Sequence, residues 1–182
     1  MDGFCGCVDN ACKTSVCKPF AGEGEVCGGF RMASAVTYCN SNEFTCVAPN
    51  FIADIGGRCG ASTTVQALLA NPTAFNGRYV ALTGVVASAF PRCTLMACGP
   101  QNPCCNACSA PLALWDNAAQ VHTIAGLGLV VDGIPQSCGG NSCDFDDHCS
   151  MEQGSYFIGG WFSWDGFSGS LEVTQRYSAP VH

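Results

Sequence analysis

The sequence has few charged residues, and those present are mostly acidic. Lys, Arg, Asp and Glu make up 12% of its 182 residues, whereas an average soluble domain has about 25%. The formal net charge is −7, and no lysine follows Lys18. Because a nucleic acid backbone is bound through clustered lysine and arginine, this composition argues against a nucleic acid partner.

Long apolar stretches are also missing. A membrane-spanning helix needs about 20 consecutive apolar residues, and no run in the chain approaches this length, so we expect no transmembrane segment. The first ten residues, MDGFCGCVDN, lack the basic start and apolar stretch of a signal peptide. We interpret Met1 as standing where a signal peptide has been removed from a secreted or periplasmic protein.

Cysteine, in contrast, is abundant, and its distribution predicts two disulfide frameworks. The chain has 16 cysteines, a density typical of small proteins from oxidising compartments, in which cross-links replace a large core. Half of them lie before residue 60 and half after residue 90. The first set is Cys5, Cys7, Cys12, Cys17, Cys27, Cys39, Cys46 and Cys59, and the second is Cys93, Cys98, Cys104, Cys105, Cys108, Cys138, Cys143 and Cys149. We therefore predict two modules, residues 1–59 and 60–182, each closed by its own disulfides.

Zinc binding is the competing interpretation of the cysteines. Zinc sites commonly combine C-x-x-C units with histidine, and the only such unit here joins Cys105 to Cys108. The same unit could carry out thiol–disulfide exchange, which needs a nearby cation or a helix start to lower the thiol pKa. Arg92 is the nearest cation in the sequence. Structural disulfides remain the preferred interpretation.

The cysteine spacing also contains a short repeat. Cys93-x4-Cys98-x5-Cys104 is followed by a second stretch with the same spacing that begins at Cys138. Both stretches lie in predicted loops, so bridges between them could fasten one end of the strands, and the alternative is a chance repeat. Eight cysteines allow 105 pairings, so the connectivity stays open.

Residues 1–59 show no periodic hydrophobic pattern, so disulfides must supply most of the constraint on their fold. The stretch 22–29, GEGEVCGG, is followed by Cys39 and Cys46. This pattern resembles the small cysteine-rich modules of insulin-like growth factor-binding proteins and Dickkopf-type proteins, which place a G-E-x-C-G turn before a cysteine-containing hairpin. The GCGCC cluster of the growth factor binders is reduced here to Cys5-Gly-Cys7, so the resemblance does not extend to hormone binding.

Residues 60–182 predict a mainly β fold that begins with one short helix. Ser62 or Thr63 can cap a helix over residues 64–70, which ends before Pro72. A strongly alternating strand follows the turn at Asn76-Gly77, and a hairpin joins the last two strands. The predicted strands are 78–88, 112–115, 126–131, 156–164 and 170–177.

The first of these strands and the last hairpin resemble a known fold. The stretches NPTAFNGRYVALTGVV and GSYFIGGWFS…GSLEVTQRY are similar to the first strand and the last hairpin of the oligonucleotide/oligosaccharide-binding (OB) fold. The resemblance covers residues 63–178. It implies a five-stranded OB-like β-barrel that follows the small disulfide-rich module.

The same hairpin holds the candidate binding residues. Four aromatic side chains, those of Tyr156, Trp161, Trp164 and Phe167, can form a surface that stacks on a sugar ring or anchors a protein partner. Successive strand residues face opposite sides, so at least one tryptophan points away from the interior or into the turn. The alternative is that the helix or the cysteine-rich module covers it.

One acidic loop is a candidate metal site. Carboxylates of Asp144, Asp146 and Asp147 can bind Ca²⁺ through oxygen atoms, and His148 can join them for a transition metal. The glycine and the bidentate glutamate of an EF-hand loop are missing. The alternative is a solvated acidic loop between Cys143 and Cys149. No other cofactor is expected.

These features together predict a secreted, disulfide-stabilised binding protein that recognises a protein or glycan and catalyses no reaction. The chain has only three histidines and no G-x-S-x-G nucleophile motif. Two other functions stay open. Its few charges and high apolar content also suit a subunit of an extracellular or cell-surface assembly. A protease inhibitor is the second, because Cys5-Gly-Cys7 is similar to the Cys-x-Cys start of the tissue inhibitors of metalloproteinases, and antistasin-type inhibitors are short cysteine-rich chains.

Overall fold

The computed structural model describes residues 3–7, 15–19, 21–28, 39, 44–48, 56–145 and 148–179, with the backbone alone for 3–7 and 15–19. It confirms a mainly β protein with many disulfides. The early strands are β1 (Gly3–Cys7), β2 (Ser15–Pro19), β3 (Val26–Gly28), β4 (Thr45–Val47) and β5 (Gly56–Ser62). The later elements are α1 (Val65–Ala70), α2 (Pro72–Phe75), β6 (Tyr79–Ser88), β7 (Arg92–Cys93), β8 (Ala107–Trp115), a 3-10 turn (Ala118–Gln120), β9 (Leu127–Val131), β10 (Ile134–Pro135), β11 (Ser137–Asn141), β12 (Gly154–Trp164) and β13 (Gly169–Ser178).

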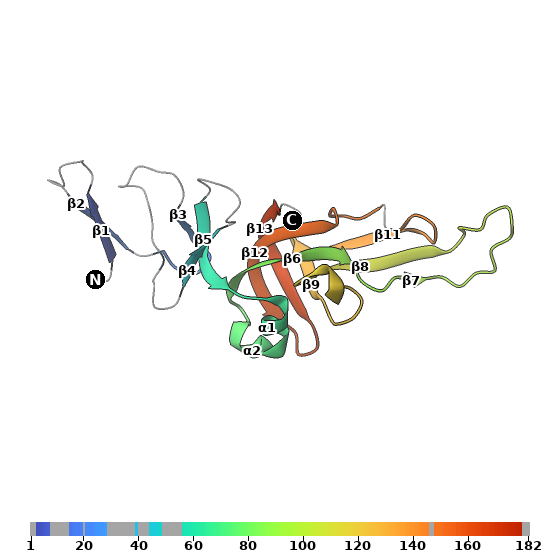
Figure 1. Ribbon diagram of the computed structural model, residues 1–182, viewed down its shortest axis with the longest axis horizontal. Helices are drawn as coiled ribbons and strands as arrows, with labels where there is room; N and C mark the ends of the chain where they lie inside the picture. Colours follow the sequence, from blue (N-terminus) through green and yellow to red (C-terminus); the bar gives the residue numbers. More distant parts are fainter. Residues whose placement is uncertain are drawn as a thin grey trace.

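Five of these strands pair in a closed ring. β6 pairs with β8 and β12, β13 pairs with β12 and β9, and β8 pairs with β9. Only the pair of β9 with β13 is parallel among these five. β8 continues past the ring and pairs there with β7 and β11. In Figure 1 the small N-terminal strands lie at one end of the molecule, and the long connection between β7 and β8 projects at the other.

The main core lies between the ring and α1. Alternate residues of each strand face inward, because successive side chains of a strand point to opposite sides. Burying one large aliphatic or aromatic side chain stabilises the fold by about 1.5–3 kcal/mol. The buried core side chains include Val65, Leu68, Val80, Leu82, Val86, Leu112, Leu114, Leu127, Leu129, Ile158, Phe162 and Leu171.

The predicted helix is present, but its cap differs from the prediction. Thr64 is the N-cap residue, and its hydroxyl oxygen accepts a hydrogen bond from Ala67 N at 3.1 Å. The carboxylate of Asp116 accepts two more, from Val65 N at 2.6 Å and Gln66 N at 3.1 Å. Ser62 belongs to β5 instead. A carboxylate 51 residues away in the chain therefore completes this helix start.

The five predicted strands correspond to the five ring strands, with differences at their ends. The largest difference is at β8, which begins at Ala107 instead of residue 112. β5 and β11 were not predicted, since their sequences GGRCGAS and SCGGN are rich in glycine and lack the alternation of apolar residues. Neither helix among the described residues has the length and apolar content needed to cross a lipid bilayer.

Two of the small N-terminal strands, β3 and β4, are joined to the ring through β5. β5 pairs with β3 and β4, and its last residues pair with the start of β6. A second apolar cluster lies at this junction, where Val47 of β4 packs with Tyr79, Ala81 and Phe157 on the outer side of the ring. We call the contact of residues 21–28 and 44–48 with β6 and β12 the junction.

Six disulfides are described, and each joins two cysteines of the same half of the chain. Cys27–Cys46 and Cys39–Cys59 lie in the N-terminal part. The later bridges are Cys93–Cys108, Cys98–Cys105, Cys104–Cys143 and Cys138–Cys149. The bridge from Cys104 to Cys143 connects the two loops that share a cysteine spacing, as one of the two interpretations of that repeat predicts. The pairing of Cys5, Cys7, Cys12 and Cys17 lies outside the described side chains.

Candidate functional site

Two of the four predicted aromatic contact residues are turned towards the core. Tyr156 is 5% exposed, and its hydroxyl donates a hydrogen bond to Glu152 O at 2.9 Å. Trp164 is partly buried and packs against the main core. These two side chains follow the alternation expected of β12.

Trp161, on the outer side of β12, is part of the junction. Its ring meets the ring of Tyr79 edge-on, with centroids 5.4 Å apart, and 39% of the residue is exposed. Gly24 has a φ of +77° and lies against the same ring, so that a Cβ atom there would overlap Trp161 Cζ2. The N-terminal module therefore covers part of this tryptophan, which is the alternative that the sequence left open.

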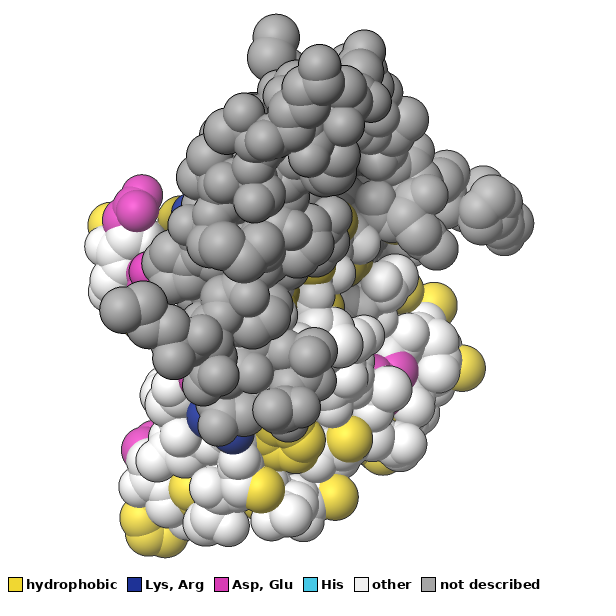
Figure 2. Space-filling view, turned by 90° about the vertical axis from the view of Figure 1, so that its left-hand side faces the viewer, with side chains coloured by type: hydrophobic (Ala, Val, Ile, Leu, Met, Phe, Trp, Pro, Cys, Tyr) yellow, Lys and Arg dark blue, Asp and Glu magenta, His cyan; other side chains and the backbone are white. Residues whose placement is uncertain are grey.

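Polar contacts fix the same turn to the ring. Glu23 accepts hydrogen bonds from Arg78 Nε and Tyr79 N, both at 2.8 Å. Gly24 donates to Cys59 O at 2.7 Å, and its carbonyl accepts from Arg58 Nη1 at 2.6 Å. Figure 2 views this end of the molecule and shows scattered acidic and apolar side chains with few basic ones on the described surface. The contacts hold residues 22–25 in one position on β5 and the start of β6.

Tyr79 stands at the centre of the junction. It is fully buried, and its hydroxyl lies 3.1 Å from both Gln175 Oε1 and Thr174 Oγ1. Burial raises the pKa of Tyr79, and the hydrogen bond with Thr174 opposes that effect. The neutral phenol is therefore the favoured form in the folded protein.

Phe167 is the most exposed of the predicted aromatic residues. It is 95% exposed in the turn between β12 and β13. Asp165 accepts hydrogen bonds from Ser168 N at 2.7 Å and Phe167 N at 2.8 Å. These bonds, with that of the Ser168 hydroxyl at 3.0 Å, lower the pKa of Asp165. The turn presents Phe167 to solvent on a hydrogen-bonded backbone.

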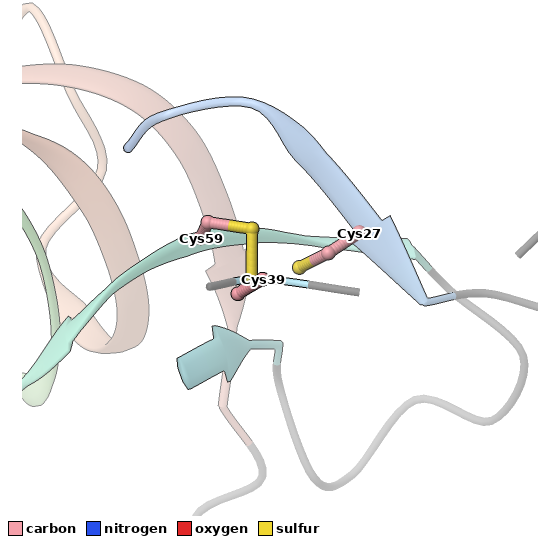
Figure 3. Close-up of side chains that lie close together, drawn as sticks. All are labelled: Cys27, Cys39 and Cys59. Atoms are coloured by element: carbon pink, nitrogen blue, oxygen red, sulfur yellow. A yellow bond between two sulfur atoms is a disulfide. The ribbon is translucent and has the colours of Figure 1, made fainter. Parts of the chain in front are cut away.

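Three sulfur atoms meet in the N-terminal module. Those of Cys27, Cys39 and Cys59 lie within 4.8 Å of one another, and Figure 3 shows Cys27 pointing towards the bond between the other two. Zinc is bound by cysteine thiolates. All three sulfurs are in disulfides here, and the arrangement serves as a pair of adjacent cross-links.

The acidic loop uses its first carboxylate to hold its own backbone. Asp144 Oδ1 accepts from Asn141 N and Oδ2 from Asn141 Nδ2, both at 3.0 Å. His148 Nε2 lies 3.6 Å from Asp144 Oδ2. Asp146 and Asp147 lie outside the described residues, so Ca²⁺ binding stays a prediction.

A long projecting loop carries features that the sequence analysis did not single out. We call residues 89–106, between β6 and β8, the finger; it extends beyond the ring in Figure 1. None of its residues is buried. Cys93–Cys108 closes its base, Cys98–Cys105 closes its far part, and Cys104–Cys143 ties it to the β11 side. Cys105 and Cys108 pair with different partners, Cys98 and Cys93, so the C-x-x-C unit does not close a disulfide within itself.

The finger exposes large apolar side chains. Leu95 is 98% exposed, Phe90 68% and Met96 55%. At its base, Phe90 contacts His122 with ring centroids 5.0 Å apart. These two residues and Trp115 line a shallow pocket of about 280 Å³. Two large apolar residues, Leu95 and Met96, between the closely spaced Cys93 and Cys98 were the signal in the sequence that could have identified this surface.

The side chain of Asn106 holds residues 94–98 of the finger in place. Asn106 Oδ1 accepts from Met96 N at 2.7 Å and from the Thr94 hydroxyl at 3.3 Å. Asn106 Nδ2 donates to Met96 O at 3.4 Å and lies 3.2 Å from Cys98 Sγ. The Thr94 hydroxyl oxygen also accepts from Ala107 N at 3.0 Å. Disulfides and hydrogen bonds thus fix a segment that has no core beneath it.

Comparison with known proteins gives no relative from which a function could be transferred: no family model, no curated protein and no solved structure matches this chain.

Proposed function

We propose that the chain is a secreted, disulfide-stabilised binding protein that recognises another protein through the finger and catalyses no reaction itself. The observation that carries the proposal is the finger, which holds Leu95 and Met96 in solvent on a cross-linked backbone. Large exposed apolar groups are typical of interaction surfaces. A segment fixed before binding loses less conformational entropy when it binds, so rigidity adds affinity.

The ring supports an OB-type assignment within this proposal. Its order, β6-β8-β9-β13-β12 and back to β6, makes the finger the connection between the first and second strands. OB folds use that connection, the connection between their last two strands, and the face of strands 2 and 3 for binding. The finger and the Phe167 turn stand in these two connections.

The proposal favours a protein partner over a glycan. Glycan binding was expected from an open aromatic platform, and Trp161 is instead partly covered by Gly24. The apolar side chains of the finger, in contrast, stand on a projecting segment that can enter a pocket of a partner. Six described disulfides fit an extracellular or otherwise oxidising compartment, and we place the partner outside the cytoplasm.

Affinity capture from extracellular proteins of the source organism tests the proposal. The immobilised native chain is compared with a finger variant, Leu95→Ser with Met96→Ser, and with a control variant, Ile134→Ser with Val26→Ser. The control residues are also exposed, 64% and 52%, but lie outside the finger and outside the Phe167 turn. We expect the same proteins on the native chain and on the control variant and their loss on the finger variant. Equal capture by all three would refute the proposal.

The alternative of an assembly subunit is separated by sedimentation. A subunit of a homomeric assembly should self-associate as its concentration rises, whereas the proposed binding protein should stay monomeric alone. Self-association that the finger variant abolishes would favour the alternative.

A further inference from the structure

We propose that residues 93–98 of the finger are a substrate-like inhibitory segment for a serine endopeptidase with an apolar specificity pocket. Leu95 enters that pocket, and the Leu95–Met96 peptide bond faces the catalytic serine. This inference rests on the proposed function, because it names the class of the protein partner.

The backbone of this segment forms no turn or helix that would prevent an endopeptidase from binding it. Such enzymes bind their substrates as extended strands and place the side chain before the cleaved bond in a specificity pocket. Residues 94–99 contain no turn or bend. Leu95 has 98% of its surface open to solvent, against 55% for Met96. A leucine side chain suits an apolar pocket and not one that holds a buried carboxylate.

Asn106 holds the residues on both sides of Leu95 and leaves Leu95 itself free. On the amino side, its Oδ1 accepts from the Thr94 hydroxyl at 3.3 Å. On the carboxyl side, the same oxygen accepts from Met96 N at 2.7 Å, and Nδ2 donates to Met96 O at 3.4 Å. One side chain therefore bridges the peptide bond that would be attacked. A bound enzyme meets a segment that is already ordered, which strengthens binding.

The disulfides keep the two sides together if that bond is cut. Cys93–Cys108 joins a residue before the Leu95–Met96 bond to a residue after it. Cys98–Cys105 closes the part that begins at Met96. Thr94 N also donates to Ala107 O at 2.9 Å. After cleavage the new amino group of Met96 would stay close to the carbonyl carbon of Leu95.

This tethering explains why the chain would inhibit the endopeptidase and would not be digested by it. When the serine oxygen forms an ester with the Leu95 carbonyl carbon, the bond to Met96 N breaks and the proton lost by the serine goes to that nitrogen. Held by Asn106 and the disulfides, the Met96 amine attacks the Leu95 carbonyl carbon before water enters. The peptide bond forms again, the ester bond to the serine oxygen breaks, and the serine oxygen takes back its proton. The high effective concentration of a tethered nucleophile favours this return. The enzyme stays occupied by an intact chain.

The test uses the full chain with native disulfides against chymotrypsin and subtilisin, which accept large apolar residues, and against trypsin. Residual activity on a chromogenic peptide is measured as the chain is titrated. We expect inhibition of at least one of the first two enzymes. Leu95→Gly should weaken it about 100-fold, the effect of losing an interface anchor. Leu95→Lys should transfer inhibition to trypsin. Ile134→Lys, the same kind of change at an exposed residue of β10 outside the finger, should have no effect.

Asn106→Ala tests the proposed role of the bridge. We expect this variant to bind at first but to be cut at the Leu95–Met96 bond about 100-fold faster than the native chain, because the freed Met96 amine no longer stays in place. Mass spectrometry after reduction identifies the cleaved bond. Equal cleavage rates for the native chain and Asn106→Ala would overturn the role given to Asn106.

Two results would overturn the inference as a whole: no inhibition of either apolar-specific enzyme, or inhibition that Leu95→Gly and Leu95→Lys leave unchanged. If finger-dependent capture of extracellular proteins persists in that case, the proposed function stands and only the partner class is wrong. If the native chain and the finger variant also capture the same extracellular proteins, both the proposed function and this inference are refuted. Thermal unfolding of each variant checks that these surface substitutions leave the fold intact.

Discussion

Replacing Gly24 by alanine should loosen the junction between the N-terminal module and the ring. Gly24 has a φ of +77°, and its added Cβ would overlap the ring of Trp161. Adopting the left-handed conformation costs a residue with a Cβ roughly 1–2 kcal/mol. Displacing a packed side chain costs about 1–3 kcal/mol more. We therefore expect Gly24→Ala to lower the free energy of unfolding by roughly 2–5 kcal/mol.

Gly77→Ala is the matched control for the backbone part of this cost. Gly77 has a φ of +76°, and an added Cβ there would meet no atom within 4 Å. It should lose only the roughly 1–2 kcal/mol of the backbone conformation. The difference between the two variants reports the contact with Trp161. Urea unfolding without reductant, followed by tryptophan fluorescence and circular dichroism, measures both values. Equal losses in the two variants would show that Gly24 does not pack against Trp161.

Cysteine chemistry and two titrations give further checks. Denatured, unreduced protein should react with at most four equivalents of a thiol reagent, since six described disulfides use twelve of the sixteen cysteines. Because Asp165 has a lowered pKa, its carboxylate should stabilise the turn fully above the ordinary carboxyl pKa, and this stabilisation should be lost as pH falls through the lowered pKa. The loss should appear as faster amide exchange of Phe167, and Asp165→Asn should remove this pH dependence. Because Tyr79 has a raised pKa, its contribution to the free energy of unfolding should be present below the ordinary tyrosine pKa and be lost as pH rises through the raised pKa. Phenolate absorbance measures this titration.

The ring strands could be predicted because their signal is local. Residues 79–88 alternate between inward and outward positions, and the inward Val80, Leu82 and Val86 are apolar enough to be recognised without knowledge of their partners. β5 and β11 have no such signal, since glycine and cysteine dominate them. Their pairing depends on β6 and β8, which lie in other parts of the sequence. A strand that forms because a neighbouring strand pairs with it, without alternating apolar residues of its own, cannot be found by searching for that alternation.

Which aromatic side chains of the hairpin are exposed could not be predicted from the sequence, for a related reason. The aromatic hairpin attracted the prediction because tryptophan and phenylalanine are conspicuous in a sequence. The exposure of Trp161 depends on the Gly24 turn, which is 137 residues earlier in the chain. The finger depends on Asn106, whose role is set by hydrogen bonds to residues 94 and 96. An asparagine between cysteines gives no sign of such bonds until the backbone is placed.

The junction also decides whether the N-terminal module is a separate appendage or part of the folded ring. Val47 is 6% exposed and packs against Tyr79 and Phe157 on the outer side of the ring. Val26, in the neighbouring short strand β3, is 52% exposed. If the module is needed to cover this outer face, a charge at Val47 should damage both parts, and a charge at Val26 should damage neither.

Val47→Asp and Val26→Asp make that comparison with the same chemical change. An unpaired charge buried at Val47 should lower the free energy of unfolding by roughly 3–5 kcal/mol, whereas an exposed substitution changes it by about 0.5 kcal/mol or less. In Val47→Asp the amide of Gly24, which donates to Cys59 O, should exchange faster as the turn leaves the ring. If the exchange rate of this amide is unchanged and the two variants have equal free energies of unfolding, the ring is stable without the module covering its outer apolar face. Faster exchange and a larger loss of stability in Val47→Asp would show that the N-terminal module and the ring share the apolar cluster of the junction. The module, the ring and the finger then form one folded unit.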